Sequence, residues 1–514
     1  MFYDGKIWIG QSGEEKVFIE PRMASRHGLI AGATGTGKTI TLKVLAESFS
    51  DAGVPVFLAD IKGDLSGMCR PGIAGEDMKK RIQKFGLEEC GFDFHAYPTT
   101  FWDIYGEMGI PTHTTISEMG PILLSKIMDL NDTQSDILTV VFKIADDRDL
   151  LLIDTKDLKA MLQYVSENSA ELSTDYGNIA KQSVAAILRN VVALEAVGGE
   201  NFFAEPALNL SDWFFSADMS GKGSINILDC RKLVQDTTLY STFLLWMLSE
   251  LFETLPEVGD LDKPRMVFFF DEAHLLFKDI SKALRSKIEQ VVKLIRSKGV
   301  GVYFISQSPS DIPNEVLTQL GNKIQHALRA YTPADEKVVK AAAQSFRVNP
   351  EFETYEAITS LGVGEAVISV LDEEGIPSMA KKCKVLPPQS MMGGISDEEK
   401  KQEILKNAIY LRYKDEIDRD SAYEFMQRMK QEAAAVGTTT AQMQKGTSKT
   451  EKKPTAEERA AARRRKSVAT SAANTIGREL GKTLGGAVGG SFGKKLGGNV
   501  GASLARNILG TFMK

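Results

Sequence analysis

Short apolar runs, each bounded by turn residues, predict the strands of one buried sheet along much of the chain. The runs that we expect to form these strands are His27–Ala31, Val54–Asp60, Ser224–Leu228, Arg265–Phe270, Gly301–Ser306, Lys323–Ala330 and Ala366–Leu371. Apolar positions at helical spacing follow some of them, at Thr39–Ser50, Tyr240–Leu255 and Ile280–Ser297. This alternation of strands and helices is typical of a parallel α/β sheet.

Residues 115–214 have a different pattern, in which helical periods dominate and strand-like runs are rare. The helical periods there are Ile116–Leu130, Thr133–Ala145, Asp157–Val165 and Asn178–Ala196. We therefore expect a mainly helical insertion that divides an α/β core into residues 26–114 and 215–390. Two alternating runs around a polar turn predict a small hairpin within residues 1–25.

The C-terminal part of the chain divides into a charged helical segment and a tail. Residues 391–436 contain Ser396 with Glu399, a spacing that fits a capping box at a helix start. Residues 437–514 are a low-complexity tail, and its glycines at four-residue spacing are Gly477, Gly481, Gly485, Gly489, Gly493, Gly497 and Gly501. On a helix this spacing lines one face for close packing against another helix. A flexible tail without such packing is the alternative.

Charge is divided unevenly between these parts. The 514-residue chain has 62 Lys and Arg against 68 Asp and Glu, a formal net charge of −6, which excludes a uniformly basic nucleic-acid binder. The tail holds 15 basic and 4 acidic residues, a net charge of +11, which leaves −17 for residues 1–436. Such a tail is suited to contact a polyanion, such as nucleic acid or an anionic membrane, and a solvated tail is the alternative.

Cysteine use and hydropathy indicate the cellular compartment in which we expect the protein. The four cysteines lie far apart and form no metal-binding or disulfide pattern, which favours a reducing compartment. No run of about 18 uncharged apolar residues is present, so we expect no transmembrane helix. The N-terminus lacks the apolar region of a signal peptide. We therefore expect a cytoplasmic protein.

The strongest chemical signal is a glycine-rich loop between a strand and a helix. Its residues are Gly32, Ala33, Thr34, Gly35, Thr36, Gly37, Lys38 and Thr39, which fit G-x-x-x-x-G-K-[ST]. Glycines let backbone N–H groups surround phosphate oxygens, and the helix N-terminus adds its positive dipole end. We expect Lys38 to reach the β- and γ-phosphates of ATP and the Thr39 hydroxyl to hold Mg²⁺. The strand before and the helix after the loop argue against a chance match.

The apolar strand Arg265–Phe270 runs into two carboxylates, Asp271 and Glu272. Ligands bind at the carboxyl ends of strands in open α/β sheets. We expect Asp271 to hold Mg²⁺ through water and Glu272 to polarise the attacking water. Solvated carboxylates at a strand end are the alternative. His274 follows without any further helicase-like segment, so we interpret it as a packing residue.

Two later positions complete the candidate catalytic set. Gln307 follows the strand Gly301–Ser306, and its amide would bridge γ-phosphate, water and Glu272 if that strand is central. A turn-forming amide is the alternative. Arg329 ends the next predicted strand and is a candidate arginine finger, in cis or across a subunit boundary. A surface salt bridge is equally compatible with its position.

These residues together resemble the HerA/FtsK group of P-loop motor ATPases, in particular bacterial HerA-like helicase C-terminal domain proteins. The resemblance covers about residues 1–390, and the segments that carry it are GATGTGKT, VFLADIKGDLSG, FFFDEAH, VGVYFISQSPSDIP and Asn322–Arg329. It implies a RecA-like sheet with an additional strand between the phosphate-loop strand and the Asp271 strand. Asp60 and Lys62 fall within the second segment, and we assign them no role.

The resemblance also implies ligands, roles and assembly. The ligands are ATP and Mg²⁺, and a hexameric ring of identical chains is expected. The implied roles are nucleotide and metal contact by Lys38 and Thr39, metal contact by Asp271, catalysis by Glu272, γ-phosphate sensing by Gln307 and finger or sensor action by Arg329. Only about 25 residues precede the first core strand, so we do not expect the sizeable N-terminal barrel of HerA proper.

Three functions fit these observations. The first is a ring that moves on DNA, which the net charge of −17 disfavours unless the ring lumen is basic. The second is a protein-remodelling or secretion-type ATPase, which the glycine-rich basic tail favours. The third is a nucleotide-dependent oligomeric scaffold, which the presence of both Asp271 and Glu272 disfavours.

Overall fold

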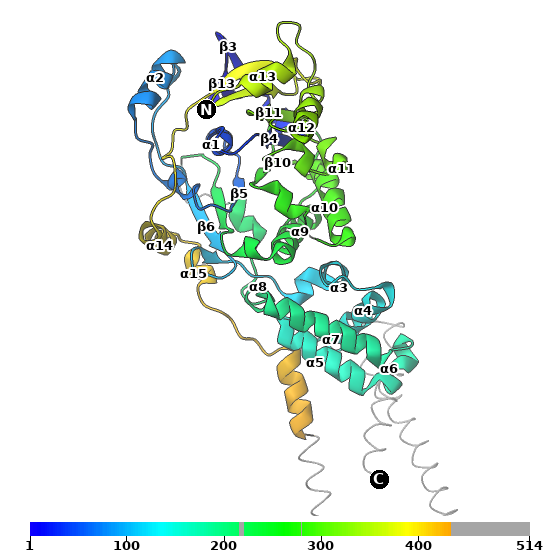
Figure 1. The fold of residues 1–514 in the computed structure, drawn as a ribbon. Coiled ribbons are helices and arrows are strands. Elements are labelled where there is room, and N and C mark those ends of the chain that lie inside the picture. Colours follow the sequence, from blue (N-terminus) through cyan, green and yellow to red (C-terminus); the bar gives the residue numbers. More distant parts are fainter. Residues whose placement is uncertain (215–219, 279, 433–514) are drawn as a thin grey trace, which may run out of the picture. The chain divides into compact units, whose positions relative to one another are not determined.

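The computed structural model describes residues 1–214, 220–278 and 280–432 (Figure 1). Thirteen strands of the described residues form one sheet. The strands are β1 Phe2–Tyr3, β2 Lys6–Ser12, β3 Glu15–Ile19, β4 Gly28–Ala31, β5 Val56–Asp60, β6 Thr99–Asp103, β7 Ile110–Pro111, β8 Ile225–Asp229, β9 Met266–Phe270, β10 Val300–Ser306, β11 Asn322–Gln325, β12 Glu365–Ser369 and β13 Lys381–Val385.

Fifteen α-helices accompany this sheet within the described part of the chain. They are α1 Lys38–Asp51, α2 Glu76–Lys84, α3 Ile116–Ile127, α4 Asp132–Asp146, α5 Thr155–Glu167, α6 Ser169–Tyr176, α7 Lys181–Ala196, α8 Gly199–Phe202, α9 Thr237–Thr254, α10 Lys282–Ile295, α11 Asn314–Leu317, α12 Pro333–Gln344, α13 Thr354–Ser360, α14 Asp397–Lys406 and α15 Tyr410–Tyr413. All of these elements belong to one compact unit, Met1–Lys430.

The order of the strands in the sheet is β1-β2-β13-β12-β11-β4-β10-β9-β5-β8-β6-β7, and β3 pairs with β2. The eight strands from β11 to β7 are parallel, whereas the strands at the other end pair in antiparallel fashion. Strand β10 lies between β4, which precedes the glycine-rich loop, and β9, which precedes Asp271. The predicted RecA-like sheet with an additional strand is thereby confirmed.

Both faces of the central sheet are covered. Phe269 of β9 packs against Phe49 of α1, with ring centroids 6.2 Å apart. Phe268 lies on the opposite face, against Phe57 and Trp213, with centroids 5.2 and 6.2 Å apart. Because successive side chains of a strand point to opposite faces, a strand covered on both sides is apolar throughout. This is why these strands stand out as continuous apolar runs in the sequence.

Helix α1 is buried even on the side that carries polar residues. Lys43 and Glu47 have exposed fractions of 0% and 1%. The backbone N–H groups of Gln389 and Ser390 donate to the Glu47 carboxylate at 2.7 and 3.1 Å, and Lys43 donates to a carbonyl of the same crossing segment. We call this segment, residues 386–395, the strap. It holds α1 against the sheet from the outside.

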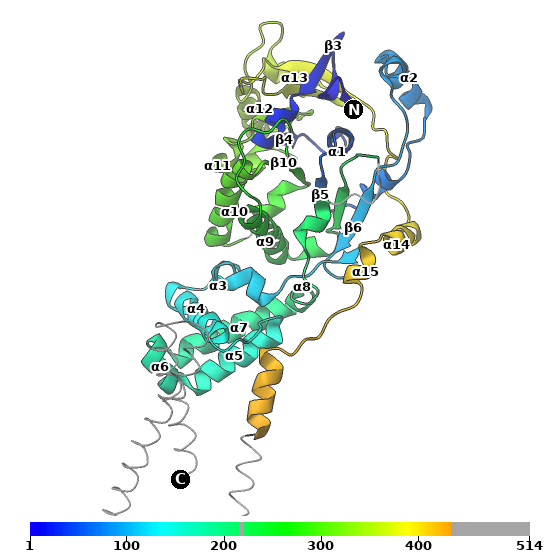
Figure 2. The same cartoon turned by 180° about the vertical axis from the view of Figure 1, so that it is seen from behind.

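Helices α3 to α8 come from the region expected to be a helical insertion and pack on one another as a group (Figures 1 and 2). Helix α3 contacts α4, and α4 and α5 contact α7. The group adjoins the sheet layer through α3, which also contacts α9 and α10. The long gap in sequence between β7 and β8 is therefore filled by helices that leave the strand order of the sheet undisturbed.

The sheet is larger than the apolar pattern predicts. Strands β6, β7 and β13 were not anticipated, because they are short or rich in Thr and Lys. The N-terminal hairpin also extends the same sheet, since β2 pairs with β13. Strand β11 ends at Gln325 rather than at the predicted Ala330, because the next residues turn to the glycine-rich loop. The N–H of His326 donates to Ala31, and the carbonyl of Ala327 accepts from Ala33.

Beyond the strap the chain forms α14, α15 and a helical stretch at residues 422–432. Ser396 caps α14 in a reciprocal capping box with Glu399, as the spacing predicts. The glycine-rich tail, 437–514, lies outside the described residues. No helix within the described ranges is long and apolar enough to cross a membrane.

Candidate active site

Four neighbouring strands bring Lys62 and all of the predicted site residues except Arg329 to the same edge of the sheet. Strand β10 is hydrogen-bonded to β4 and β9, and β9 is hydrogen-bonded to β5, all in parallel. The residues that follow these strands are the loop 32–39, Gln307, the pair Asp271–Glu272, and Lys62. They therefore gather at the carboxyl edge, where open α/β sheets bind their ligands.

The glycine-rich loop wraps closely at the start of α1. Gly37 is the N-cap residue and has φ of 112°, in the left-handed region that favours glycine. A Cβ atom at Gly32 would lie 2.5 Å from the Cβ of His326, so the approach of these two segments requires glycine. The Thr36 hydroxyl donates to the Ala33 carbonyl at 2.7 Å and closes the loop. This tight wrap before a helix N-terminus is the geometry that phosphate binding uses.

Lys38 lies beneath this loop. Its Nζ donates to the carbonyls of Gly32 at 2.6 Å and Ala33 at 3.0 Å. The residue is 8% exposed, and burial lowers the pKa of its ammonium, although the charges of Glu272 and Asp271 oppose this shift. A desolvated cation whose hydrogen-bond partners are neutral carbonyls is strongly stabilised by a nearby anion. The loop and its lysine therefore fit a nucleotide phosphate.

The two carboxylates after β9 occupy an unusual turn. The Asp271 Oδ1 accepts the backbone N–H of Glu272 at 2.9 Å. Glu272 has φ of 44° and ψ of 48°, a left-handed conformation that is uncommon for residues with a Cβ atom. Such backbone strain concentrates at functional sites. The Gln307 Nε2 donates to Glu272 Oε2 at 3.3 Å, so the structure brings this predicted pair together.

Lys62, to which the sequence pattern assigned no role, contacts both carboxylates. Its Nζ lies 2.7 Å from Glu272 Oε1 and 3.6 Å from Asp271 Oδ2. The buried side chain of Asp60 accepts the N–H of Gly63 at 2.7 Å and shapes the loop that carries the lysine. One signal in the sequence could have indicated this contact. Lys62 stands two residues beyond a predicted strand, and the end of that strand lies at the same sheet edge as Asp271.

These contacts give the two neighbouring carboxylates different ionisation. Burial raises the pKa of Glu272, but the hydrogen bond and charge of Lys62 and the amide of Gln307 outweigh it, and the net pKa lies below the usual value. At Asp271 burial outweighs the charge of Lys62, and the pKa is raised. Glu272 is therefore ionised at neutral pH and suited to accept a hydrogen bond from water. The carboxylate of Asp271 is buried, and a nearby cation would stabilise its charged form.

His274 differs from its prediction as a packing residue. Its side chain is 31% exposed, and its Nδ1 lies 3.5 Å from Glu272 Oε2. The reason is the left-handed turn at Glu272, which brings the short 3-10 helix Ala273–Leu276 back over the carboxylate. The sequence pattern does not reveal this turn, because a glutamate gives no local signal for positive φ.

Arg329 has its contacts elsewhere. It is exposed, and its guanidinium donates to the carbonyl of Thr359 and, at 3.1 Å, to that of Leu361, at the end of α13. Within one chain these hydrogen bonds lead to α13 and not to Glu272. A finger acting across a subunit boundary stays a prediction.

Oxygen donors for Mg²⁺ are present at the start of α1 and the end of β9. Thr39 is the second residue of α1, and Asp271 is 5% exposed. Mg²⁺ prefers oxygen ligands and usually binds one or two carboxylates together with substrate phosphates and water. Among the residues that the structure describes, no group of three or more His, Cys, Asp or Glu is arranged for a metal ion. The donor set thus fits a metal shared with phosphate.

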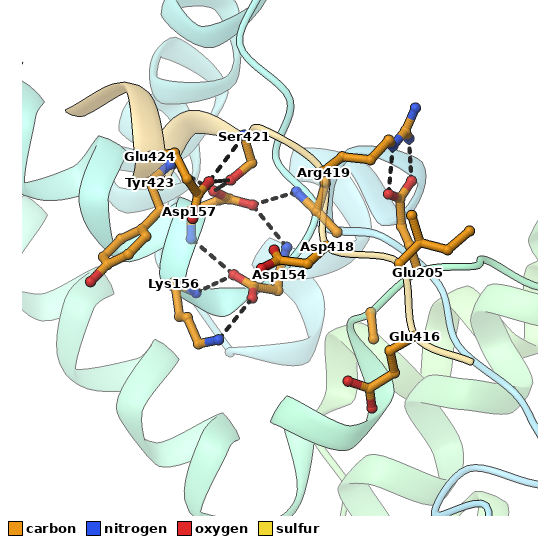
Figure 3. A pocket seen from close by; sticks show the side chains of 13 residues that line it. Asp154, Lys156, Asp157, Glu205, Glu416, Asp418, Arg419, Ser421, Tyr423 and Glu424 are labelled. Atoms are coloured by element: carbon orange, nitrogen blue, oxygen red, sulfur yellow. Dashed lines mark hydrogen bonds and ion pairs between the residues drawn. The ribbon is translucent and has the colours of Figure 1, made fainter. Parts of the chain in front are cut away.

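A cavity of about 370 Å³ lies away from this edge, between α5 and residues 416–424 (Figure 3). The Tyr423 N–H donates to the buried Asp157 carboxylate at 2.8 Å, and the Ser421 hydroxyl also donates to it. Most of the labelled charged side chains around this cavity are acidic and would repel phosphate. Its contacts attach the C-terminal segment to the helical group, and we do not assign nucleotide binding to it.

The fold and the site define a class of protein. The chain is a P-loop ATPase of the additional-strand type. It has a glycine-rich phosphate loop ahead of α1, an acidic end on β9, and a polar residue at the end of β10, which lies between β4 and β9.

Comparison with known proteins gives the family. The family described as Helicase HerA-like C-terminal matches residues 7–514, and the chain belongs to it. The DNA double-strand break repair helicase HerA of Sulfurisphaera tokodaii is 24% identical over 380 residues, which are 72% of this chain and 67% of that protein. The helicase of the same name from Sulfolobus acidocaldarius is 23% identical over 374 residues, 71% of this chain and 66% of its own length.

Solved structures that this chain matches over most of their length include two proteins. The plasmid coupling protein TrwB in complex with an ATP analogue has 14% sequence identity and a TM-score of 0.48, covering 72% of this chain and 87% of TrwB. VirB4 of Thermoanaerobacter pseudethanolicus has 16% identity and a TM-score of 0.45, covering 75% of this chain and 97% of VirB4. The family assignment rests on the sequence match.

Proposed function

We propose that this chain hydrolyses ATP with Mg²⁺ and uses the energy to move on DNA as part of a ring of identical chains. The observation that carries the hydrolysis is the placement of the Glu272 carboxylate. Lys62 and Gln307 hold it at the sheet edge that also carries the phosphate loop and Asp271. A fixed, ionised carboxylate at this place is suited to orient water for attack on the γ-phosphate.

Each residue of the site has one role in this proposal. Lys38 binds the β- and γ-phosphate oxygens, and Thr39 with Asp271 holds the metal. Bound Mg²⁺ neutralises charge on the phosphates and orients them. Glu272 orients the attacking water and accepts its proton, and Gln307 links the γ-phosphate to Glu272.

DNA as the substrate is supported by the family and by two relatives that are named as DNA repair helicases. The net charge of −17 on residues 1–436 favours the alternative, a protein-remodelling ATPase, because DNA binding depends mainly on neutralising phosphates. A DNA motor of this kind must concentrate its basic residues on the surface that meets the duplex.

ATP turnover separates these two candidates. We expect hydrolysis by the purified chain to rise when duplex or single-stranded DNA is added and to rise less as salt increases, because counterion release weakens with salt. RNA and a neutral polymer serve as controls at the same salt. Robust basal turnover that no nucleic acid changes at low salt would favour the protein-remodelling function.

We assign Arg329 to the γ-phosphate of a neighbouring subunit. The support is its place beyond β11 and the exposure of the residue. Mixing Arg329→Ala chains with Lys38→Ala chains should restore part of the turnover, because each mixed boundary can combine an intact loop with an intact finger. Mixed rings that stay inactive would limit Arg329 to a role within its own chain.

The remaining assignments are part of the same proposal. We place the protein in the cytoplasm as a hexamer and retain the domain borders predicted above. The basic tail, 437–514, serves self-association or contact with another helix or an anionic membrane surface. Sedimentation and liposome binding of a chain without these residues, compared with the full chain, would test that role.

A further inference from the structure

Lys62 reaches the acidic strand end from the neighbouring strand. Ala59 of β5 is level with Phe270 of β9, so the residues that follow the two strands leave the sheet side by side. The loop after β5 is fixed from inside by Asp60, whose carboxylate accepts the N–H groups of Gly63 at 2.7 Å and Leu65 at 3.2 Å. The lysine is thus carried by a short, hydrogen-bonded turn.

The Glu272 carboxylate is held through both of its oxygens. Oε1 accepts from Lys62 at 2.7 Å, and Oε2 accepts from Gln307 at 3.3 Å. These donors come from loops on either side of β9, and the Nδ1 of His274 lies 3.5 Å from Oε2. Separate donors at the two oxygens set the direction of the carboxylate as well as its position.

Stability alone does not account for this ion pair. The Lys62 side chain is 44% exposed, and ion pairs of such lysines contribute roughly 0–1 kcal/mol to folding. The side chains of Glu272 and Asp271, taken alone, are 12% and 8% exposed and are far more buried than that of the lysine. What the ion pair does provide is a fixed position for the Glu272 carboxylate, whose backbone is already in a strained turn.

We propose that Lys62 is a positioning residue for ATP hydrolysis, which holds the Glu272 carboxylate through Oε1 while Gln307 restrains Oε2. This inference rests on the proposed hydrolysis at this site. Lys62 acts through Glu272 and does not bind the phosphates. Phosphate binding is assigned to Lys38. Its loss should therefore affect turnover far more than ATP binding.

Three variants test this with steady-state kinetics. Lys62→Met removes the charge and keeps the length, Lys62→Arg keeps the charge, and Lys143→Met changes an exposed ion pair on α4 as a control. We expect Lys62→Met to lower kcat on the order of 10- to 100-fold, because a misplaced catalytic group costs that much. KM for ATP should change little, Lys62→Arg should recover part of kcat, and Lys143→Met should match the unmodified chain.

A binding measurement without turnover separates positioning from phosphate contact. In a Glu272→Gln background, adding Lys62→Met should leave the Kd for ATP within about threefold, a change that corresponds to about 0.7 kcal/mol. A loss of tenfold or more would show that Lys62 binds phosphate, and would overturn the inference.

Two further outcomes keep this inference distinct from the proposed function. If the unmodified chain hydrolyses ATP and Lys62→Met does so equally fast, the positioning role is wrong and the ATPase assignment stands. If the unmodified chain does not hydrolyse ATP, the proposed function fails and this inference fails with it.

Discussion

Lys38→Ala should abolish measurable ATP binding and hydrolysis. The Lys38 ammonium is nearly buried and hydrogen-bonded to carbonyls of Gly32 and Ala33, so its charge is desolvated at the proposed phosphate site. Hydrogen bonds to charged groups contribute about 1.5–3 kcal/mol each. Losing the two proposed contacts of Lys38 with the β- and γ-phosphates would therefore weaken ATP binding by roughly 100-fold or more. Equilibrium binding of ATP with Mg²⁺, followed by turnover, measures this effect.

Lys143→Ala is the matched control, because Lys143 is an exposed lysine on α4 paired with Asp147. The fold of Lys38→Ala should persist, since removing a buried charge that has no carboxylate hydrogen bond relieves a desolvation cost. Thermal unfolding of the variant checks this. Normal turnover in a folded Lys38→Ala chain would show that the nucleotide binds elsewhere.

Glu272→Gln should bind ATP and fail to hydrolyse it. The amide has the shape of the carboxylate and retains an oxygen for Lys62, but it cannot accept a proton from water. General-base contributions are typically on the order of 10²–10⁴-fold, and we expect kcat to fall within that range. The Kd for ATP should stay close to that of the unmodified chain, because Lys38 and the loop are unchanged.

Glu289→Gln is the control for this change. Glu289 on α10 accepts from Arg285 in an i,i+4 pair, so the variant loses one surface ion pair and no site contact. Single-turnover experiments at saturating ATP separate the chemical step from binding. If Glu272→Gln hydrolysed ATP at the normal rate, another group would have to orient the water, and the assignment of Glu272 would be wrong.

The sequence could predict those parts of the site that local patterns encode. The loop 32–39 was recognisable because its glycines and Lys38 stand between an apolar strand and a helical period. Asp271 and Glu272 were recognisable because they end a run of buried aromatic residues. The pairing of Gln307 with Glu272 was predicted only on the condition that its strand is central, and the order of the sheet meets that condition.

Other features of the site could not be predicted because they depend on distant segments. The contact of Lys62 with Glu272 joins residues 210 positions apart, and no local spacing relates them. The position of His274 depends on the left-handed turn at Glu272. Arg329 was placed on a strand that ends earlier, because the residues after Gln325 pair with the loop instead.

The sequence by itself determined the class of fold, the phosphate loop and the acidic strand end, because apolar period and glycine spacing act over a few neighbouring residues. Only the tertiary structure decided which strands are neighbours, and hence that Lys62 and Gln307 hold Glu272 from two sides. It also decided that the polar face of α1 is buried, since the strap supplies N–H groups to Glu47 from residues about 340 positions away. Buried polar groups must form hydrogen bonds, and their partners can lie in distant segments. The local sequence pattern does not indicate which distant segment supplies the partner.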